Sequence, residues 1–127
     1  MGSRVAAPAK HRVLVVDDDE QVRELVKDAL EPMECEIVTS PDGADGLERW
    51  SKESFDLLIT DLLVPRLDGL RLAEAVRARS PKAKILVITA VSHSLEKELK
   101  AAPIDGWLPK PLNIGKLKAR VRDLLNA

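Results

Sequence analysis

The sequence predicts an α/β protein in which five parallel strands alternate with five helices. Three observations support this prediction. Short runs of β-branched and aliphatic residues recur along the chain, a helical apolar pattern follows each run, and capping or helix-stopping residues separate the two. Regular alternation of this kind places helices on both faces of one parallel sheet. The length of 127 residues suits a single domain, because two domains would each bury too small a core.

The expected strands are mostly apolar, as strands covered on both faces should be. The first spans 12–16 (RVLVV), the third 55–60 (FDLLIT) and the fourth 84–89 (KILVIT). The second, at 34–39, is more polar, so we expect it at an edge of the sheet. A short fifth strand is expected at 104–108.

The expected helices have recognisable boundaries and apolar faces. The residues that cap, start or stop them are Asp19, Pro32, Ser40 to Asp42, Asp68, Pro103 and Asn113. The positions expected to face inward are Val22, Leu25, Val26, Ala29 and Leu30 in the first helix, Ala44, Leu47 and Trp50 in the second, Leu72, Ala75 and Val76 in the third, and Ile114, Leu117, Val121, Leu124 and Leu125 in the last.

Five such strand–helix units can be joined in few ways, because crossovers between parallel strands are right-handed. The common doubly wound solution is the flavodoxin-like strand order 2-1-3-4-5. Strands one and three are then neighbours, and the chain reverses direction between them. Ligands bind outside the carboxyl ends of the strands at such a reversal, so the residues that follow the strands are the candidates for function.

Composition narrows the possible functions and locations. With 20 basic and 21 acidic side chains the net charge is only -1, so we expect no direct binding to nucleic acid or to a membrane surface. The single cysteine, Cys35, cannot form an intramolecular disulfide and is expected to be a small buried hydrophobe in a reducing compartment. The expected location is the cytoplasm, because no apolar run reaches the length of a membrane span and the amino terminus lacks a signal-peptide core. Residues 1–10 show no usable periodicity and are expected to form a flexible tail.

Acidic, hydroxyl and ammonium groups follow the expected strands. Asp17 and Asp18 follow the first strand, Asp61 the third, Thr89 ends the fourth and Lys110 follows the fifth. Two carboxylates about 4 Å apart repel by about 4 kcal/mol at an effective dielectric near 20, so the cluster requires either cations that relieve the repulsion or protonation of some of the acids. Lys110 supplies one positive charge, and a hard divalent ion, Mg²⁺ or Mn²⁺, fits the oxygen ligands.

A hydroxyl, an ammonium and a metal ion around one carboxylate can stabilise a phosphoryl group on it. Carboxylates also serve as nucleophiles that form acyl phosphates. Asp61 is the best candidate because it stands singly at a strand end, whereas Asp17 and Asp18 are better placed as metal ligands. The sequence therefore predicts phosphorylation of Asp61.

The segments VLVVDDDE, DLLITDLLVPRLDGL, ILVITA and WLPKPL, in this order and spacing, resemble the four signature segments of response-regulator receiver domains. The resemblance covers about residues 11–127 and implies a two-component phosphorelay protein that is a signalling domain rather than an enzyme. The roles that it implies are Asp61 as phosphoacceptor; Asp17, Asp18, Asp61 and the backbone carbonyl of Leu63 as metal ligands; Thr89, Lys110 and Trp107 as phosphate-contacting or switch residues; and Leu63 and Val91 as flanking residues that tune the rate of dephosphorylation.

The resemblance also implies partners. A histidine kinase or histidine phosphotransfer protein would phosphorylate Asp61, and the fourth helix, fifth strand and fifth helix would then change to control a downstream target or a missing output domain. The chain would be a monomer or a dimer promoted by phosphorylation. A cis Lys110–Pro111 peptide bond is implied too, and the apolar Leu63 and Val91 suggest slow loss of the phosphoryl group.

Two other functions stay open. A haloacid-dehalogenase-like small phosphatase would use Asp17 as nucleophile and Asp19 as acid. The short chain and the absence of that class's cap domain count against this function. A pseudo-receiver adaptor would bind partners without phosphorylation, although the acid, threonine and lysine set is complete. A flavin-binding flavodoxin is disfavoured because the loop after the first strand is acidic and would repel a flavin phosphate.

Overall fold

The computed structural model describes residues 11–90 and 95–127; the tail expected at 1–10 and the rate-tuning position Val91 lie outside them. The strands are β1 (His11–Val16), β2 (Cys35–Ser40), β3 (Leu57–Asp61), β4 (Lys84–Thr89) and β5 (Gly106–Pro109). The helices are α1 (Glu20–Leu30), a short 3-10 helix (Glu31–Met33), α2 (Gly43–Lys52), α3 (Gly69–Arg79), α4 (Glu96–Ala101) and α5 (Ile114–Leu125).

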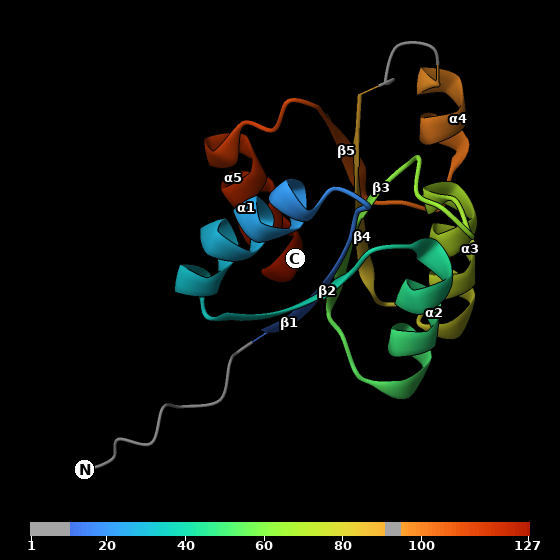
Figure 1. Ribbon diagram of the computed structural model, residues 1–127, viewed down its shortest axis with the longest axis horizontal. Coiled ribbons are helices and arrows are strands. Elements are labelled where there is room, and N and C mark those ends of the chain that lie inside the picture. The colour runs from blue at the N-terminus through green and yellow to red at the C-terminus, as the bar shows by residue number, and fades with distance from the viewer. Residues whose placement is uncertain (1–10, 91–94) are drawn as a thin grey trace.

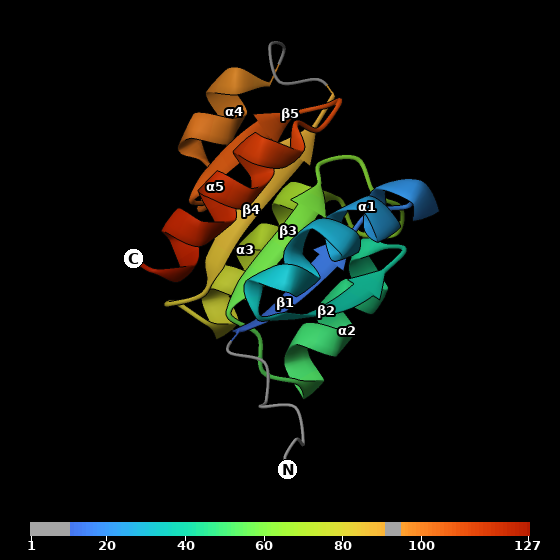
Figure 2. The ribbon, with the colours of Figure 1, turned by 90° about the vertical axis from the view of Figure 1, so that its left-hand side faces the viewer.

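The five strands form one parallel sheet in the order β2-β1-β3-β4-β5. Helices α1 and α5 cover one face, and α2, α3 and α4 cover the other (Figures 1 and 2). This arrangement confirms the α/β class and the flavodoxin-like strand order. It also confirms that the more polar second strand lies at an edge.

Apolar side chains leave the sheet in alternate directions into two core layers. Val13, Val15, Leu57, Ile59, Leu86 and Ile88 pack against α1 and α5. Leu14, Val16, Leu58 and Ile85 pack against α2 and α3. A smaller cluster, formed by Leu62, Val87 and Leu99 with Trp107 at its margin, attaches α4 to the sheet. The near-continuous apolar strands of the sequence are thus buried on both faces.

Side-chain caps fix the starts of four helices. Asp19, Asp42, Asp68 and Asn113 accept hydrogen bonds from the backbone amides of Gln21, Asp45, Arg71 and Lys116. All four capping residues belong to the helix-start segments that the sequence predicts. Each such cap stabilises its helix by about 0.5–2 kcal/mol.

Three local expectations were wrong. Leu25 does not face inward: its side chain is 43% exposed, because Val26, Ala29 and Leu30 already fill the buried side of α1. The third strand begins two residues later than expected, since Phe55 stacks on Trp50 with ring centroids 5.4 Å apart. The fifth strand begins at Gly106 rather than at residue 104.

The pair Trp50–Phe55 lies near the amino ends of the strands. The indole nitrogen of Trp50 donates to Ser80 Oγ at 2.9 Å, and the guanidinium of Arg12 lies 4.7 Å from the centre of the Phe55 ring. Trp50 is therefore fixed in a buried position, as its place on the helical stripe predicts.

Cys35 is buried with a free thiol, and burial raises the pKa of that thiol. Among the described residues, no helix combines the length and the apolar composition that crossing a membrane requires.

Candidate functional site

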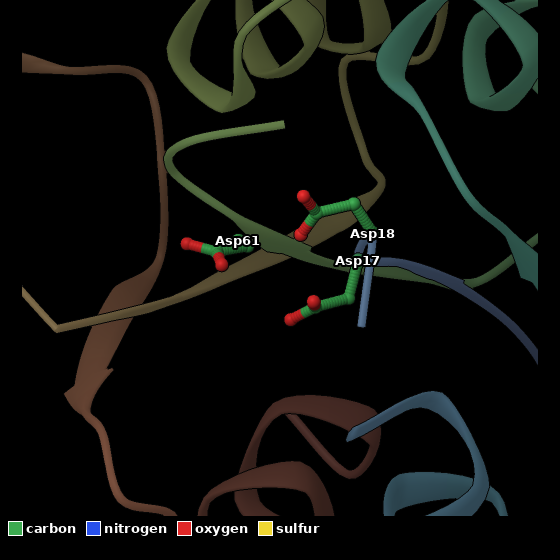
Figure 3. A group of neighbouring side chains, drawn as sticks. All are labelled: Asp17, Asp18 and Asp61. Carbon is green, nitrogen blue, oxygen red and sulfur yellow. The ribbon is translucent and has the colours of Figure 1, made fainter. Parts of the chain in front are cut away.

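Three carboxylates meet at the carboxyl ends of the neighbouring strands β1 and β3. Asp17 and Asp18 directly follow β1, and Asp61 is the last residue of β3. Figure 3 shows their side chains extending into one space from these two strand ends. One carboxylate oxygen from each residue lies within 4.8 Å of the others. The structure therefore brings together the acids that the sequence predicts as metal ligands.

Asp17 is fully buried and held at several atoms. Its amide donates to Ser40 O at 3.1 Å, its Oδ1 accepts from the Asp19 amide at 2.9 Å, and its carbonyl accepts from Arg23 Nη1 at 2.6 Å. Its Oδ2 lies 3.1 Å from Lys110 Nζ in an ion pair, but completes no hydrogen bond with the described residues. Asp17 thus presents one buried oxygen toward the site with unused acceptor capacity.

Lys110 connects the two strand ends electrostatically. Its Nζ donates to Asp61 Oδ2 at 2.7 Å and reaches Asp17 Oδ2 as well. The other oxygen of Asp61, Oδ1, accepts from the Leu63 amide at 3.2 Å, and Asp61 is only 8% exposed. The Lys110–Pro111 peptide bond is cis, as the resemblance implies.

Burial and charge pull the pKa values of these groups in different directions. Burial raises the pKa of the Asp17 carboxyl, and the hydrogen bond from the Asp19 amide and the charge of Lys110 offset this only in part. Burial by itself lowers the pKa of Lys110, but its contacts with Asp61 and Asp17 outweigh that effect, so the pKa of Lys110 is raised. Lys110 therefore remains charged beside the acids at neutral pH.

The remaining predicted residues lie on β4, on β5 and in the segments after β1 and β3, at different depths. Thr89 ends β4, is fully buried, and accepts a hydrogen bond from the Lys110 amide at its carbonyl, at 2.9 Å. Trp107, in the middle of β5, is half-buried against the α4 cluster. Leu63 is 63% exposed beside Asp61. Asp19 caps α1 and is not one of the three acids that converge.

The loop between Asp61 and α3 is held by two glycines that leave no room for a side chain. A Cβ at Gly69 would collide with the Asp61 carbonyl oxygen, and one at Gly43 would collide with the Leu67 carbonyl oxygen. The amides of the same two glycines donate to Leu62 O at 2.8 Å and to Pro65 O at 3.1 Å. These close approaches fix the path of the backbone that carries Asp61.

Sequence reasoning missed Arg23 and the close approach at Gly43. Arg23 is six residues from the carbonyl that it binds, and no periodicity or strand-end rule indicates such a contact. Gly43 follows the capping residue Asp42, where glycine alone carries little information. Only the fold reveals that both residues support the site.

The donor set fits a hard divalent cation such as Mg²⁺ or Mn²⁺. Three carboxylates supply oxygen atoms, and the buried Oδ2 of Asp17, which pairs with Lys110 but completes no hydrogen bond with the described residues, is the kind of acceptor that a cation would satisfy. Such a cation would also relieve the repulsion that Lys110 alone leaves among three acids.

Comparison with known proteins identifies one family. The model of the family described as response regulator receiver domain matches residues 13–122. Curated relatives include the response regulators MprA of Mycobacterium ulcerans, 37% identical over 115 residues, and of Mycobacterium leprae, 36% identical over 115 residues. The matches cover 90% of this chain and 50% of each relative, so the chain spans about half the length of these proteins.

Solved structures agree with the sequence matches. The response regulator TrrA from Thermotoga maritima, solved in complex with Mg²⁺–BeF, is 35% identical with a TM-score of 0.83. The chemotaxis response regulator CheY4 of Vibrio cholerae is 32% identical, also with a TM-score of 0.83. Each match covers 90% of this chain and 98% of the other.

Proposed function

The chain belongs to the response regulator receiver domain family of two-component systems, and on this premise we propose that residues 11–127 form a switch driven by phosphorylation of Asp61. The phosphoryl donor is a histidine kinase or a histidine phosphotransfer protein. The observation that carries the proposal is the bridge from Lys110 Nζ to both Asp61 Oδ2 and Asp17 Oδ2, next to converging acids. This bridge supports the proposal, because it holds a positive charge next to the carboxylate that would carry the phosphoryl group.

In the proposed transfer, a carboxylate oxygen of Asp61 attacks phosphorus. An O–P bond forms while the P–N bond of the donor phosphohistidine breaks, and its electron pair returns to the imidazole. Lys110 neutralises charge on the phosphoryl oxygens, and Thr89 donates a hydrogen bond to one of them. Asp17, Asp18, Asp61 and the backbone carbonyl of Leu63 would hold Mg²⁺ or Mn²⁺, which supplies further charge neutralisation when bound.

The phosphatase alternative loses support from the surroundings of Asp17 and Asp19. Asp17 is fully buried and paired with Lys110, so it is poorly exposed to a substrate. Asp19 uses its side chain to cap α1 and would have to give up that hydrogen bond to act as an acid. We therefore propose no independent enzymatic activity beyond self-phosphorylation and slow hydrolysis of the aspartyl phosphate.

This chain has a surface next to the site that suits docking of the proposed donor. A groove of about 250 Å³ runs between α1 and the segment after β5, and it is lined in part by Val22, Leu25, Pro111 and Leu112. Lys110 borders the same groove. An apolar helix face of the donor protein could pack there while its phosphohistidine reaches Asp61.

The proposed output uses the surface formed by α4, β5 and α5. The phosphoryl group carries about two negative charges in place of the single charge of the Asp61 carboxylate, which would draw Thr89 and Lys110 toward it. Trp107 lies on β5 beside α4, so it would repack in the same change. A downstream target, an output domain or a second copy of the chain would bind the new surface. We propose that this occurs in the cytoplasm.

We further propose slow loss of the phosphoryl group, because the flanking Leu63 and Val91 offer no polar atom of their side chains to orient a hydrolytic water. The exposed side chain of Leu63 beside Asp61 supports this for one of the two positions.

The test is the intact mass of the protein after incubation with a small-molecule phosphodonor, with and without Mg²⁺, beside Asp61→Asn. We expect one added phosphoryl group that requires both Mg²⁺ and Asp61. Sustained hydrolysis of a phosphomonoester that Asp17→Asn abolishes and Asp61→Asn retains would instead establish the phosphatase. Failure of both the donor and a cognate kinase to modify the chain would favour a pseudo-receiver.

A further inference from the structure

We propose that Arg23 is a positioning residue for the metal site, acting through the backbone of Asp17. Its Nη1 donates to the Asp17 carbonyl oxygen at 2.6 Å from a part-buried position in the first turn of α1. The inference rests on the proposed metal-dependent function and assigns part of it to a residue outside the acidic cluster.

The Asp17 carbonyl lies just beyond the strand ladder. The pairing of β1 with β2 and with β3 ends at Val16, so neither ladder extends to Asp17. The Asp17 amide is tied to Ser40 O, and Arg23 ties the carbonyl on the other side of the same residue. Both peptide groups around Asp17 are thereby fixed, and with them the direction of its buried carboxylate.

Arg23 also couples this strand end to α1. Its amide donates to Asp19 O at 3.1 Å in the first turn of the helix, while its guanidinium reaches back to Asp17. Asp18 lies between these two contacts, so its exposed carboxylate is carried on a turn that is held at both ends. Partners that orient metal ligands in this way typically change metal affinity by roughly 10- to 100-fold when they are removed.

Position and charge make opposite predictions for Arg23. A positive charge near three acids repels a cation, so if Arg23 acted only through its charge, removing it would strengthen Mg²⁺ binding. If Arg23 acts by holding Asp17, removing it weakens Mg²⁺ binding despite the loss of repulsion. The sign of the change therefore separates the two roles.

The experiment is calorimetric titration of Mg²⁺ into the unmodified chain, Arg23→Met, Arg23→Lys and Arg71→Met. Arg71 is a matched control, since it is an exposed arginine in the first turn of α3 and its loss changes the net charge equally. We expect Arg23→Met to raise the Kd for Mg²⁺ by roughly 10-fold or more. Arg23→Lys should recover part of the loss, and Arg71→Met should stay within about 2-fold of the unmodified chain.

Thermal unfolding in EDTA accompanies each titration. If Arg23→Met unfolds at a lower temperature but binds Mg²⁺ with unchanged or smaller Kd, Arg23 is only structural or electrostatic and the inference is overturned. If Arg23→Met does not fold, Arg23→Lys decides, because a Kd equal to that of the unmodified chain would overturn the inference. Absence of Mg²⁺ binding by the unmodified chain would overturn the proposed metal-dependent function as well.

Discussion

Adding one methyl group at Gly69 should disturb the loop that carries Asp61. A Cβ there would collide with the Asp61 carbonyl oxygen and lie 2.9 Å from Leu62 Cα and 3.0 Å from the Asp61 carbonyl carbon. All three neighbours are backbone atoms, so no flexible side chain can move aside. Overpacking of this kind costs about 1–3 kcal/mol, and the gain of up to about 1 kcal/mol from replacing a helical glycine by alanine offsets part of it.

We therefore expect Gly69→Ala to lower the free energy of unfolding by about 1–2 kcal/mol. Urea denaturation measures this as a lower midpoint at unchanged slope. Phosphorylation by a small-molecule donor should slow by roughly 10-fold or more, since Asp61 must shift with its carbonyl. Intact mass against time gives that rate.

Gly115→Ala is the matched control. Gly115 also lies in the first turn of a helix, but a Cβ there meets only Asn113 Oδ1, at 3.3 Å. Its stability should stay within about 0.5 kcal/mol of the unmodified chain, and its phosphorylation rate should not change. Equal stability and equal rates for the Gly69 and Gly115 variants would refute the argument that close backbone approach sets the position of Asp61.

Three further predictions concern pH, docking and hydrolysis. Burial raises the pKa of Asp17 above its ordinary 3.8, so in metal-free protein its contribution to stability is fully present below pH 3.8 and is lost as the pH rises through the raised pKa. Thermal unfolding in EDTA should show this loss of stability with rising pH when the unmodified chain is compared with Asp17→Asn. A gain of stability with rising pH would contradict the prediction. Leu25→Asp should slow transfer from the partner kinase while phosphorylation by a small-molecule donor continues normally, and equal slowing of both would exclude a docking role. Leu63→Asn should shorten the lifetime of the aspartyl phosphate measured by intact mass, and an unchanged lifetime would show that this side chain does not tune hydrolysis.

Much of the site could be predicted because parallel strands share one direction. Residues that follow strands far apart in the sequence, such as Asp17, Asp61 and Lys110, must meet at the end of the sheet where the carboxyl ends of the strands lie. The hydrophobic runs identify the strands, so the acids and the lysine could be brought together without knowledge of any distance. The helix starts could be predicted as well, since the caps Asp19, Asp68 and Asn113 and the start segment that contains Asp42 needed only local sequence.

Other features depend on packing that local patterns do not contain. The spacing of Leu25 fits an inward-facing stripe, but Val26, Ala29 and Leu30 occupy the buried side of α1 and leave Leu25 exposed. Phe55 is an aromatic residue of the kind that favours strands, yet it stacks on Trp50 and lies before the first residue of β3. The bond from Arg23 to Asp17 depends on the rotamer of a long side chain, which sequence spacing does not determine.

The positions of the two tryptophans have a spectroscopic consequence. The chain contains no tyrosine, so Trp50 and Trp107 account for nearly all of its near-ultraviolet fluorescence. Trp50 is buried near the amino ends of the strands, where Phe55 and Ser80 fix its ring far along the sheet from the acids. Trp107 is half-buried on β5 next to α4. The emission of Trp50 therefore follows global unfolding, while that of Trp107 also follows changes in the packing of β5 against α4, and Trp50→Phe would leave Trp107 as the single tryptophan probe of that packing.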